Sequence, residues 1–400
     1  MVDGGRPLKV LHVSQPVSGG VARWVEILAA DQRARGWDVW VACPRDGWLP
    51  ERLREVGQQT RAWDAVRSPA SRGTLGEVGR LRSIVRDLRP DVVHLHSSKA
   101  GMIGRMVIHG GIPTICQPHS WSFHATTGRM RGMVLRWERL AARWADVLLC
   151  VSETERQEGA DAGVLTSRVR VIHNGVDVTG WPYQDRTGRA KARTSLGLDQ
   201  SVPLAVTVGR LCEQKGQDLV VRAWPSVSSR VPGASLALVG DGPARAELEV
   251  ATADQAGIQL VGESDQIATW LAAADVVVLP SRWEGLALAL LEAAATGRSI
   301  VATDVGGVRE VLGAGAAGAV VSGSGETVVS HLAAAIAVRL ADRDLADEEG
   351  VAARRRIEDG FTLGAALDAT ARLTLGLVPV PSGTAATSRS APRPRRASAR

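Results

Sequence analysis

Two glutamates in the second half of the chain have a spacing that suits the binding of hydroxyl groups. Glu284 and Glu292 stand eight positions apart, directly after the apolar run DVVVLPS. Carboxylates accept hydrogen bonds from vicinal hydroxyl pairs. On one continuous helix the two would be about 12 Å apart, close to the span of a sugar diphosphate joined to a ribose. The alternative is a helix-start acid followed by a surface residue.

Two cations follow another apolar run of the same half. Arg210 and Lys215 lie in GRLCEQKG, directly after PLAVTVG. Arginine offers phosphate a bidentate fork and lysine a mobile point charge, so both suit a leaving diphosphate. A solvated loop is the alternative. Further N–H groups would come from the helix N-terminus between the glutamates. These are the amides of Gly285, Leu286, Ala287 and Leu288.

Apolar runs of strand length recur along the chain and must position these groups. They occupy residues 8–14, 38–43, 91–97, 113–119, 146–152, 169–175, 203–209, 235–242, 258–263, 275–281, 299–307 and 318–323. The runs are continuously apolar and alternate with helix-length amphipathic segments. This pattern predicts an α/β fold of two doubly wound, Rossmann-like domains that face each other across a cleft. In such sheets ligands bind beyond the carboxyl ends of the strands.

The turn signal Asn174-Gly175-Val176-Asp177 and the polar stretch after it mark the break between the domains. We expect a first domain over residues 1–177 and a second over 203–360. An irregular linker is expected between them, then a last helix and a disordered basic tail. These three segments cover residues 178–202, 361–379 and 380–400.

Composition and charge narrow the class of protein. With 400 residues and 45% hydrophobic content, the chain is long enough for two cores and is neither fibrous nor disordered. Five arginines and no acid lie within residues 381–400, so the rest of the +6 chain carries +1, which argues against nucleic acid. Without a long apolar run or a signal-peptide pattern, a cytoplasmic protein is expected. The scattered cysteines predict reduced core thiols: Cys43, Cys116, Cys150 and Cys212.

The order and spacing of several motifs resemble the retaining nucleotide-sugar glycosyltransferases of the GT-B fold, family 4. The resemblance covers nearly the whole chain up to the tail. In the first domain and at the junction it rests on Ser18-Gly19-Gly20-Val21, Pro118-His119-Ser120 and His173-Asn174-Gly175-Val176-Asp177. In the second it rests on Gly209-Arg210, Lys215-Gly216, Gly240-Asp241-Gly242-Pro243, Gly262, the two glutamates, and Val305-Gly306-Gly307 with Glu310.

The resemblance implies that the first domain binds the acceptor and the second the donor, and it implies a role for each site residue. Glu292 would bind the ribose and Glu284 the hydroxyls of the sugar of a UDP- or GDP-linked donor. The diphosphate would be held by Arg210 and Lys215, with close backbone approach at Gly19 and Gly20. His119 would lie near the reacting sugar, and Gly262 would also belong to the donor site. Family members commonly carry glycine where Ala287 stands. Neither a metal nor a cofactor is expected, since protein groups supply the positive charge.

Within the family, two segments resemble the bacterial exopolysaccharide and capsule branch. They are His96-Ser97-Ser98-Lys99-Ala100-Gly101 and the stretch from Cys116 to Phe123. The resemblance implies a saccharide or undecaprenyl-diphosphate-linked acceptor, and it allows a peripheral position on the inner face of the plasma membrane. An alternative for Ser97 and Ser98 is simple helix capping.

A basic amphipathic helix is expected over residues 128–145, with Met130, Met133, Val134, Trp137, Leu140, Ala141 and Trp144 on one stripe. This stripe could lie on an anionic membrane surface or, as we favour, pack into the first domain.

Two further motifs resemble binding sites of other proteins, and two rival functions fit the same residues. Asp342-Arg343-Asp344 spells a metal-binding pair but lies in a helical stretch, so we interpret it as a solvated helix face. The Gly240 motif lacks the third glycine and the acid of a dinucleotide fingerprint, so NAD is not expected. The rivals to a transferase are a GT-B nucleotide-sugar epimerase and a non-catalytic sugar-nucleotide-binding subunit.

Overall fold

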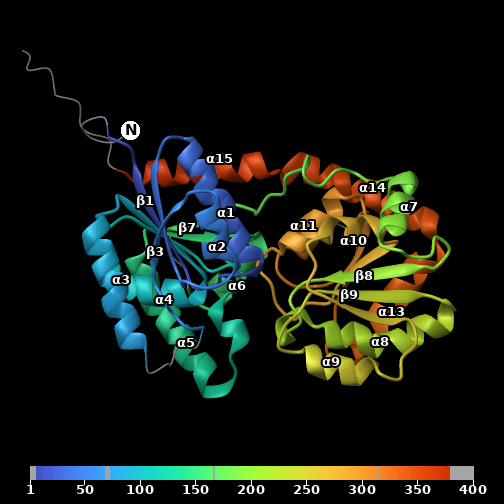
Figure 1. Ribbon diagram of the computed structural model, residues 1–400. Coiled ribbons are helices and arrows are strands. Elements are labelled where there is room, and N and C mark those ends of the chain that lie inside the picture. Colours follow the sequence, from blue (N-terminus) through green and yellow to red (C-terminus); the bar gives the residue numbers. More distant parts are fainter. Residues whose placement is uncertain (1–5, 68–72, 165–166, 314, 379–400) are drawn as a thin grey trace, which may run out of the picture.

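Two parallel sheets, each covered by helices on both faces, form the two halves of the protein (Figure 1). The computed structural model describes residues 6–67, 73–164, 167–313 and 315–378. The first sheet has the order β3-β2-β1-β4-β5-β6-β7. Its strands are β1 (Lys9–Ser14), β2 (Asp38–Cys43), β3 (Gln59–Ala62), β4 (Val92–His96), β5 (Thr114–Gln117), β6 (Val147–Cys150) and β7 (Val169–Val171).

The second sheet has the order β10-β9-β8-β11-β12-β13 and again only parallel pairs. Its strands are β8 (Leu204–Val208), β9 (Ser235–Val239), β10 (Ile258–Gly262), β11 (Val276–Leu279), β12 (Ser299–Thr303) and β13 (Gly318–Val321). The predicted fold class is thus confirmed, and each of the apolar runs contains a strand. The strand that the sequence analysis missed is β3, because QTRA is a polar, half-exposed segment at the sheet edge.

The helices flank the sheets, and most of them pack apolar side chains against the strands. Those of the first half are α1 (Gly19–Ala34), α2 (Trp48–Glu55), α3 (Thr74–Leu88), α4 (Ser97–Ile108), α5 (Gly128–Ala141) and α6 (Glu153–Asp161). Those of the second half are α7 (Arg186–Ser195), α8 (Gln217–Arg230), α9 (Arg245–Thr252), α10 (Ile267–Ala273), α11 (Leu288–Ala295), α12 (Val308–Leu312), α13 (Gly325–Ala341) and α14 (Arg343–Gly360).

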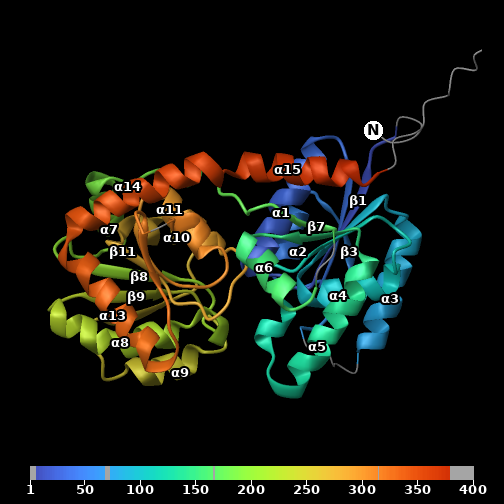
Figure 2. The ribbon, with the colours of Figure 1, turned by 180° about the vertical axis from the view of Figure 1, so that it is seen from behind.

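The last helix, α15 (Leu363–Gly376), returns to the first half of the molecule, so that α14 and α15 run along one side of both sheets (Figures 1 and 2). Ala366 of α15 packs with Trp24 and Leu28 of α1, and Arg35 pairs with Asp368 at 2.6 Å. The chain therefore crosses between the halves twice. The predicted basic tail, residues 380–400, lies outside the described residues.

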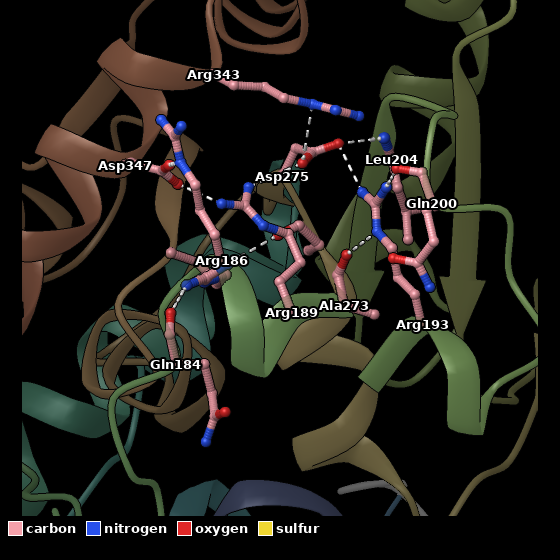
Figure 3. A network of polar contacts seen from close by, with 12 residues as sticks. Gln184, Arg186, Arg189, Arg193, Gln200, Leu204, Ala273, Asp275, Arg343 and Asp347 are labelled. Carbon is pink, nitrogen blue, oxygen red and sulfur yellow. Dashed lines mark hydrogen bonds and ion pairs between the residues drawn. The ribbon is translucent and has the colours of Figure 1, made fainter. Parts of the chain in front are cut away.

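A buried charge network fixes α7 to the base of the second sheet (Figure 3). Asp275, directly before β11, accepts hydrogen bonds from Arg189 Nη1 at 2.9 Å and Arg193 Nη2 at 2.7 Å. It also accepts one from the backbone N–H of Leu204 at 2.8 Å. Helix α7 lies inside residues 178–202, where the sequence suggested an irregular linker. Two of its arginines, Arg189 and Arg193, look like solvent-exposed residues in the sequence but are buried against this carboxylate.

Three smaller expectations concern the cysteines, the acidic pair and helix α5. All four cysteines are free and buried, as predicted. Asp342 caps the N-terminus of α14 by accepting from the N–H of Leu345 at 2.9 Å. The prediction that the whole α5 stripe packs into the core is wrong, because Met130, Met133 and Leu140 are exposed. None of the helices in the described part of the chain is long and apolar enough to cross a membrane.

Candidate functional site

The loop between β11 and α11 carries the predicted donor residues, but it is not helical throughout. Helix α11 begins at Leu288, so Glu284 lies in the loop and only Glu292 lies on the helix. The predicted spacing on one continuous helix is therefore wrong. The residue before the helix, Ala287, has φ −67° and ψ 128°, an extended backbone that any residue adopts. Alanine in place of the family's usual glycine is thus compatible with this loop.

Glu284 forms a short ion pair with Lys215 at the carboxyl edge of the second sheet. Lys215 Nζ lies 2.6 Å from Glu284 Oε1, and Ser281 Oγ donates to the same oxygen at 2.9 Å. Glu284 is buried, whereas the lysine side chain is 25% exposed. An ammonium group has three donors, so Lys215 can hold Glu284 and still donate to an anion. The structure thus brings together one predicted sugar-binding and one predicted diphosphate-binding residue.

Glu292 meets a residue of the first half that the sequence analysis missed. Arg23 of α1 places Nη1 3.1 Å from Glu292 Oε1. Burial raises the pKa of Glu292, while the positive charges of Arg23 and Lys215 oppose that shift. The carboxylate is therefore buried, faces the other domain and lies within the field of Lys215. Nothing in the sequence around Arg23 distinguishes it from the other arginines.

The same loop packs directly on the first domain. A Cβ at Gly285 would lie 2.7 Å from Val151 Cγ2 and 3.1 Å from the backbone of His119 and Ser120. Ser152 Oγ donates to the Gly285 carbonyl at 3.1 Å, and Asn174 Nδ2 donates to the Leu286 carbonyl at 2.9 Å. The glycine is thus required by the close approach of His119 to the loop that carries Glu284.

His119 lies in a strained turn after β5. His119 has φ +56° and the following Ser120 has φ +112°, values that non-glycine residues seldom adopt. Glu155 holds this turn through the backbone N–H of Ser120, at 2.6 Å, and through that of Val151, at 2.7 Å. His119 Nε2 contacts His96 Nδ1 at 3.2 Å, and burial lowers the pKa of His119 to about 3. Such strain often concentrates at functional sites, and the imidazole is neutral at physiological pH.

Arg210 lies at the carboxyl end of β8 with its side chain exposed. Within the described residues no carboxylate pairs with its guanidinium. Burial and the positive charge of Arg210 together lower the pKa of Arg67. Arg67 of the first domain, which the sequence analysis missed, therefore adds a second cation near Arg210. Two neighbouring cations without a carboxylate partner among the residues that the structure describes favour an anion between the domains.

The glycines after β1 bring a second helix N-terminus to the same place. Helix α1 begins at Gly19, whose φ of +76° suits glycine, and a Cβ at Gly20 would lie 3.7 Å from Leu288 Cδ1. The N-termini of α1 and α11 thus meet, and neither has a side-chain cap. Uncapped N–H groups at a helix start attract anions. Figure 1 shows the two helices on the facing sides of the two domains.

Gly262 stands apart from the rest of the predicted donor residues. It ends β10, the edge strand, with φ +85°, and pairs with Gly240 through an isolated bridge. Gly240 in turn lies against the carbonyl of Gly209, which precedes Arg210. The glycine is therefore connected to the site through the backbone of two other turns.

The junction motif connects the domains through one carboxylate. Glu310 accepts from His173 Nε2 at 2.7 Å and from Thr154 Oγ1 at 3.0 Å. The backbone N–H groups of Glu153 and Thr154 also donate to it, at 2.8 and 2.9 Å. His173 and Glu310 both belong to motifs that carry the family resemblance. They connect the two domains to each other and are not among the residues that we expect to bind the donor.

Both halves match known families. Residues 18–179 match the family described as Glycosyltransferase Family 4, and residues 202–342 match Glycosyl transferases group 1. The chain is 27% identical over 315 residues to an Escherichia coli UDP-Gal:alpha-D-GlcNAc-diphosphoundecaprenol alpha-1,3-galactosyltransferase, covering 75% of this chain and 80% of the relative. It is 32% identical over 293 residues to alpha-maltose-1-phosphate synthase of Mycolicibacterium smegmatis, covering 68% of this chain and 75% of the relative.

Among solved structures, Anabaena HepE in complex with UDP and glucose superposes with a TM-score of 0.78 at 20% identity, covering 92% of this chain and 99% of that chain. That likeness concerns the fold, which is GT-B, while the sequence matches concern the family. The two glutamates, the cations that pair with them and the N-termini of α1 and α11 lie where the two domains of that fold come together. The chain therefore belongs to glycosyltransferase family 4 and is a GT-B glycosyltransferase.

Proposed function

We propose that this glycosyltransferase moves a hexosyl group from a UDP- or GDP-linked sugar to a saccharide or lipid-linked acceptor, with retention at the anomeric carbon and without a metal. The pathway would be exopolysaccharide or cell-envelope glycan synthesis. One observation carries the proposal: Glu284 forms an ion pair with Lys215, and the loop that carries Glu284 packs on the turn that contains His119. The name of the E. coli relative, which specifies UDP-galactose and a diphosphoundecaprenol acceptor, and the UDP in the HepE complex support the class of donor and acceptor.

In the proposed complex, each polar group takes one part of the donor. Glu292 accepts hydrogen bonds from the ribose hydroxyls, and Glu284 accepts from the sugar hydroxyls. Lys215 bridges Glu284 and the diphosphate, while Arg210 donates to the diphosphate from the other side. The N-termini of α1 and α11 add backbone N–H groups.

The reaction follows from this placement of charge. The bond between the anomeric carbon and the diphosphate oxygen breaks, which leaves an oxocarbenium-like carbon and a more negative diphosphate. Lys215, Arg210 and the helix N-termini stabilise that negative charge as it develops. The acceptor hydroxyl attacks from the side of the leaving group, and its proton passes to a diphosphate oxygen.

A metal-independent reaction is proposed because Lys215 and Arg210 would supply the positive charge that a metal otherwise provides to the diphosphate. The test is to incubate the full-length protein with a panel of UDP- and GDP-sugars, with and without EDTA, and to measure released nucleotide and the anomeric configuration of the product. Turnover that EDTA leaves unchanged, with a retained configuration, is expected. Activity that needs added magnesium or manganese would refute the metal-free part.

The same assay separates the rival functions. A nucleotide-sugar epimerase would convert the donor sugar and transfer nothing to an acceptor, and a non-catalytic subunit would bind the donor without turnover. As a control, the Arg210→Ala, Lys215→Ala double variant is expected to lose more than about tenfold in turnover, because each charged hydrogen bond contributes roughly 1.5 to 3 kcal/mol. A fully active double variant would overturn the placement of the donor.

We also propose that the first domain contacts an anionic membrane surface through α5. Met130, Met133 and Leu140 are exposed on this helix, and exposed arginines flank them. Exposed apolar side chains beside basic ones are typical of interfacial helices. Flotation with anionic vesicles should show binding that Met130→Ser, Met133→Ser weakens. Removal of residues 382–400 in a second variant separates the contribution of the basic tail, and unchanged binding in the serine variant would contradict the role of α5.

A further inference from the structure

Four of the eight histidines of the chain gather on one face of the first sheet. His12 comes from β1, His94 and His96 from β4, and His119 from the turn after β5. The ladder pairs His12 with His94, and the rings of His94 and His96 stack with centroids 4.1 Å apart. Only His119 is partly exposed, since the other three are buried. The strands thus align imidazoles from the interior of the first domain to the loop between β11 and α11.

Hydrogen bonds connect three of these rings to one amide in an unbranched series. Gln32 Oε1 of α1 lies 2.8 Å from His12 Nε2. His12 Nδ1 lies 3.0 Å from His96 Nε2, and His96 Nδ1 lies 3.2 Å from His119 Nε2. His94 stands outside this series because its Nε2 contacts Gln117 Oε1 at 3.0 Å. Each inner ring uses both nitrogens, whereas His119 Nδ1 has no partner in the described part of the chain.

All four rings are neutral at physiological pH. Burial lowers the pKa of His12 to about 4 and that of His119 to about 3. Burial and the other histidines also lower the pKa values of His94 and His96 well below the ordinary value of 6.5. The facing groups from α1 and β5 are the uncharged amides Gln32 and Gln117, and within the described residues no carboxylate contacts the rings. Each neutral imidazole therefore has one donor and one acceptor nitrogen.

Because each neutral ring has one donor and one acceptor nitrogen, all hydrogen bonds of the series must run in the same direction. The oxygen of Gln32 only accepts, so His12 Nε2 carries the proton and His12 Nδ1 is an acceptor. His96 must then donate from Nε2 and accept at Nδ1. His119 in turn donates from Nε2, which leaves its Nδ1 as an acceptor. We infer that Gln32, His12 and His96 are positioning residues that fix His119 as the Nε2–H tautomer, with the Nδ1 lone pair available to a hydroxyl group of the donor sugar.

This inference rests on the proposed function, in which His119 lies beside the reacting sugar. A hydroxyl that donates to Nδ1 would be held in place without adding positive charge near the anomeric carbon. An imidazolium there would instead repel the oxocarbenium-like centre. The turn at His119 and Ser120 supports the same placement, because Glu155 and Gly285 hold its backbone from two sides. The series thus acts on chemistry through His119 alone.

The first test is the tautomer itself, measured without any reaction. Long-range proton–nitrogen correlation spectra of full-length protein with 15N-histidine report which nitrogen of each ring carries the proton. The resonance that His119→Asn removes identifies His119. The Nε2–H form of His119 is expected between about pH 6 and 8. An Nδ1–H form in the wild type would overturn the inference, since the opposite orientation of the Gln32 amide reverses every donor.

Matched variants test whether the series controls the tautomer. His96→Leu and Gln32→Met should give a mixture of His119 tautomers and lower kcat by roughly fivefold to tenfold, the effect of one hydrogen bond, with little change in the dissociation constant of UDP. His96→Asn, whose amide oxygen can accept from His119, should restore much of both. His94→Leu is the control, because it removes an equally buried ring outside the series and should change thermal stability but not the tautomer. An unchanged tautomer in Gln32→Met and His96→Leu would contradict the inference.

Two further outcomes have distinct meanings. If the tautomer responds as expected but His119→Asn retains full turnover, the series stands and the role of His119 in the proposed function fails. His12, His94 and His96 also offer nitrogens within 4.8 Å of one another, which a metal could share. If these nitrogens form the hydrogen-bonded series instead, zinc added to the labelled protein should leave the three resonances unchanged. Stoichiometric zinc binding that shifts them would replace the hydrogen-bonded series with a metal site and overturn the inference.

Discussion

Arg23 of α1 and Glu292 of α11 form an ion pair between the two domains, with 3.1 Å between Nη1 and Oε1. The carboxylate side chain is 10% exposed and the arginine side chain 47% exposed. Since Gly20 and Leu288 approach each other nearby, the pair stands beside the two helix N-termini. A residue proposed to bind the ribose is thus also a contact between domains, and the two roles can be separated by mutation.

Glu292→Ala is expected to weaken binding of UDP or GDP by about tenfold or more, since hydrogen bonds to a charged group contribute roughly 1.5 to 3 kcal/mol. Isothermal calorimetry measures this. Arg23→Ala is the control, because it removes the ion pair but keeps the carboxylate. If Arg23→Ala weakened binding as much as Glu292→Ala, the effect would come from the domain contact and the ribose assignment would be wrong.

Glu284→Gln should lower kcat by about tenfold or more and leave binding of the bare nucleotide diphosphate nearly unchanged, because Glu284 is proposed to meet the sugar. Steady-state kinetics together with calorimetry distinguish the two quantities. Ser281→Ala keeps the carboxylate and removes only one donor to it, so a smaller loss is expected. The assignment fails if nucleotide binding falls while kcat stays constant.

Gly285→Ala should separate the loop between β11 and α11, which carries Glu284, from the turn that contains His119. The added Cβ would lie 2.7 Å from Val151 Cγ2 and 3.1 Å from backbone atoms of His119 and Ser120, so the loop must shift. We expect kcat to fall by about tenfold, with a moderate loss of thermal stability. Gly364→Ala is the control, because no atom lies within 4 Å of its added Cβ. Equal activity of the two variants would show that the contact is not needed.

Glu310→Gln should remove a pH-dependent part of the stability. Burial alone would raise the pKa of Glu310, but the hydrogen bonds from His173 and from the start of α6 lower it from 4.5 to about 2. A carboxylate with a lowered pKa stabilises the folded state fully above about pH 4.5, and this contribution is lost as the pH falls through about 2. Thermal unfolding of the two proteins should therefore differ at neutral pH and converge as the pH falls. A constant difference would contradict this linkage.

Asp275→Asn should destabilise the second domain without affecting the chemistry. The buried side chains of Arg189 and Arg193 would lose their shared carboxylate, and removal of one partner from a buried ion pair costs about 3 to 5 kcal/mol. Denaturant unfolding measures the loss. Asp344→Asn is the control, since its side chain is 81% exposed and such pairs contribute about 1 kcal/mol at most. A similar loss in both variants would show that burial is unimportant here.

The sequence by itself determined the class of fold and the family, because both depend on local patterns. A strand buried on both faces must be continuously apolar, so each such run could be recognised without knowledge of its neighbours. The polar edge strand β3 has no such requirement and gave no signal. Glu284, Lys215 and the glycines are likewise found by their positions next to strand ends.

Tertiary structure alone decided which groups meet. Helix α11 begins at Leu288 because the loop before it packs on Val151, Ser152 and Asn174, contacts that no local pattern encodes. Arg23 and Glu292 are 269 positions apart, and His12 and His96 are 84 apart. An arginine or histidine in a sequence does not reveal its role, since the same residue type can be solvated on a surface or functional in a site. The Arg23–Glu292 pair depends on the contact between the two domains, and the His12–His96 pair depends on the pairing of β1 with β4 in the first sheet. Both are defined only in the folded protein.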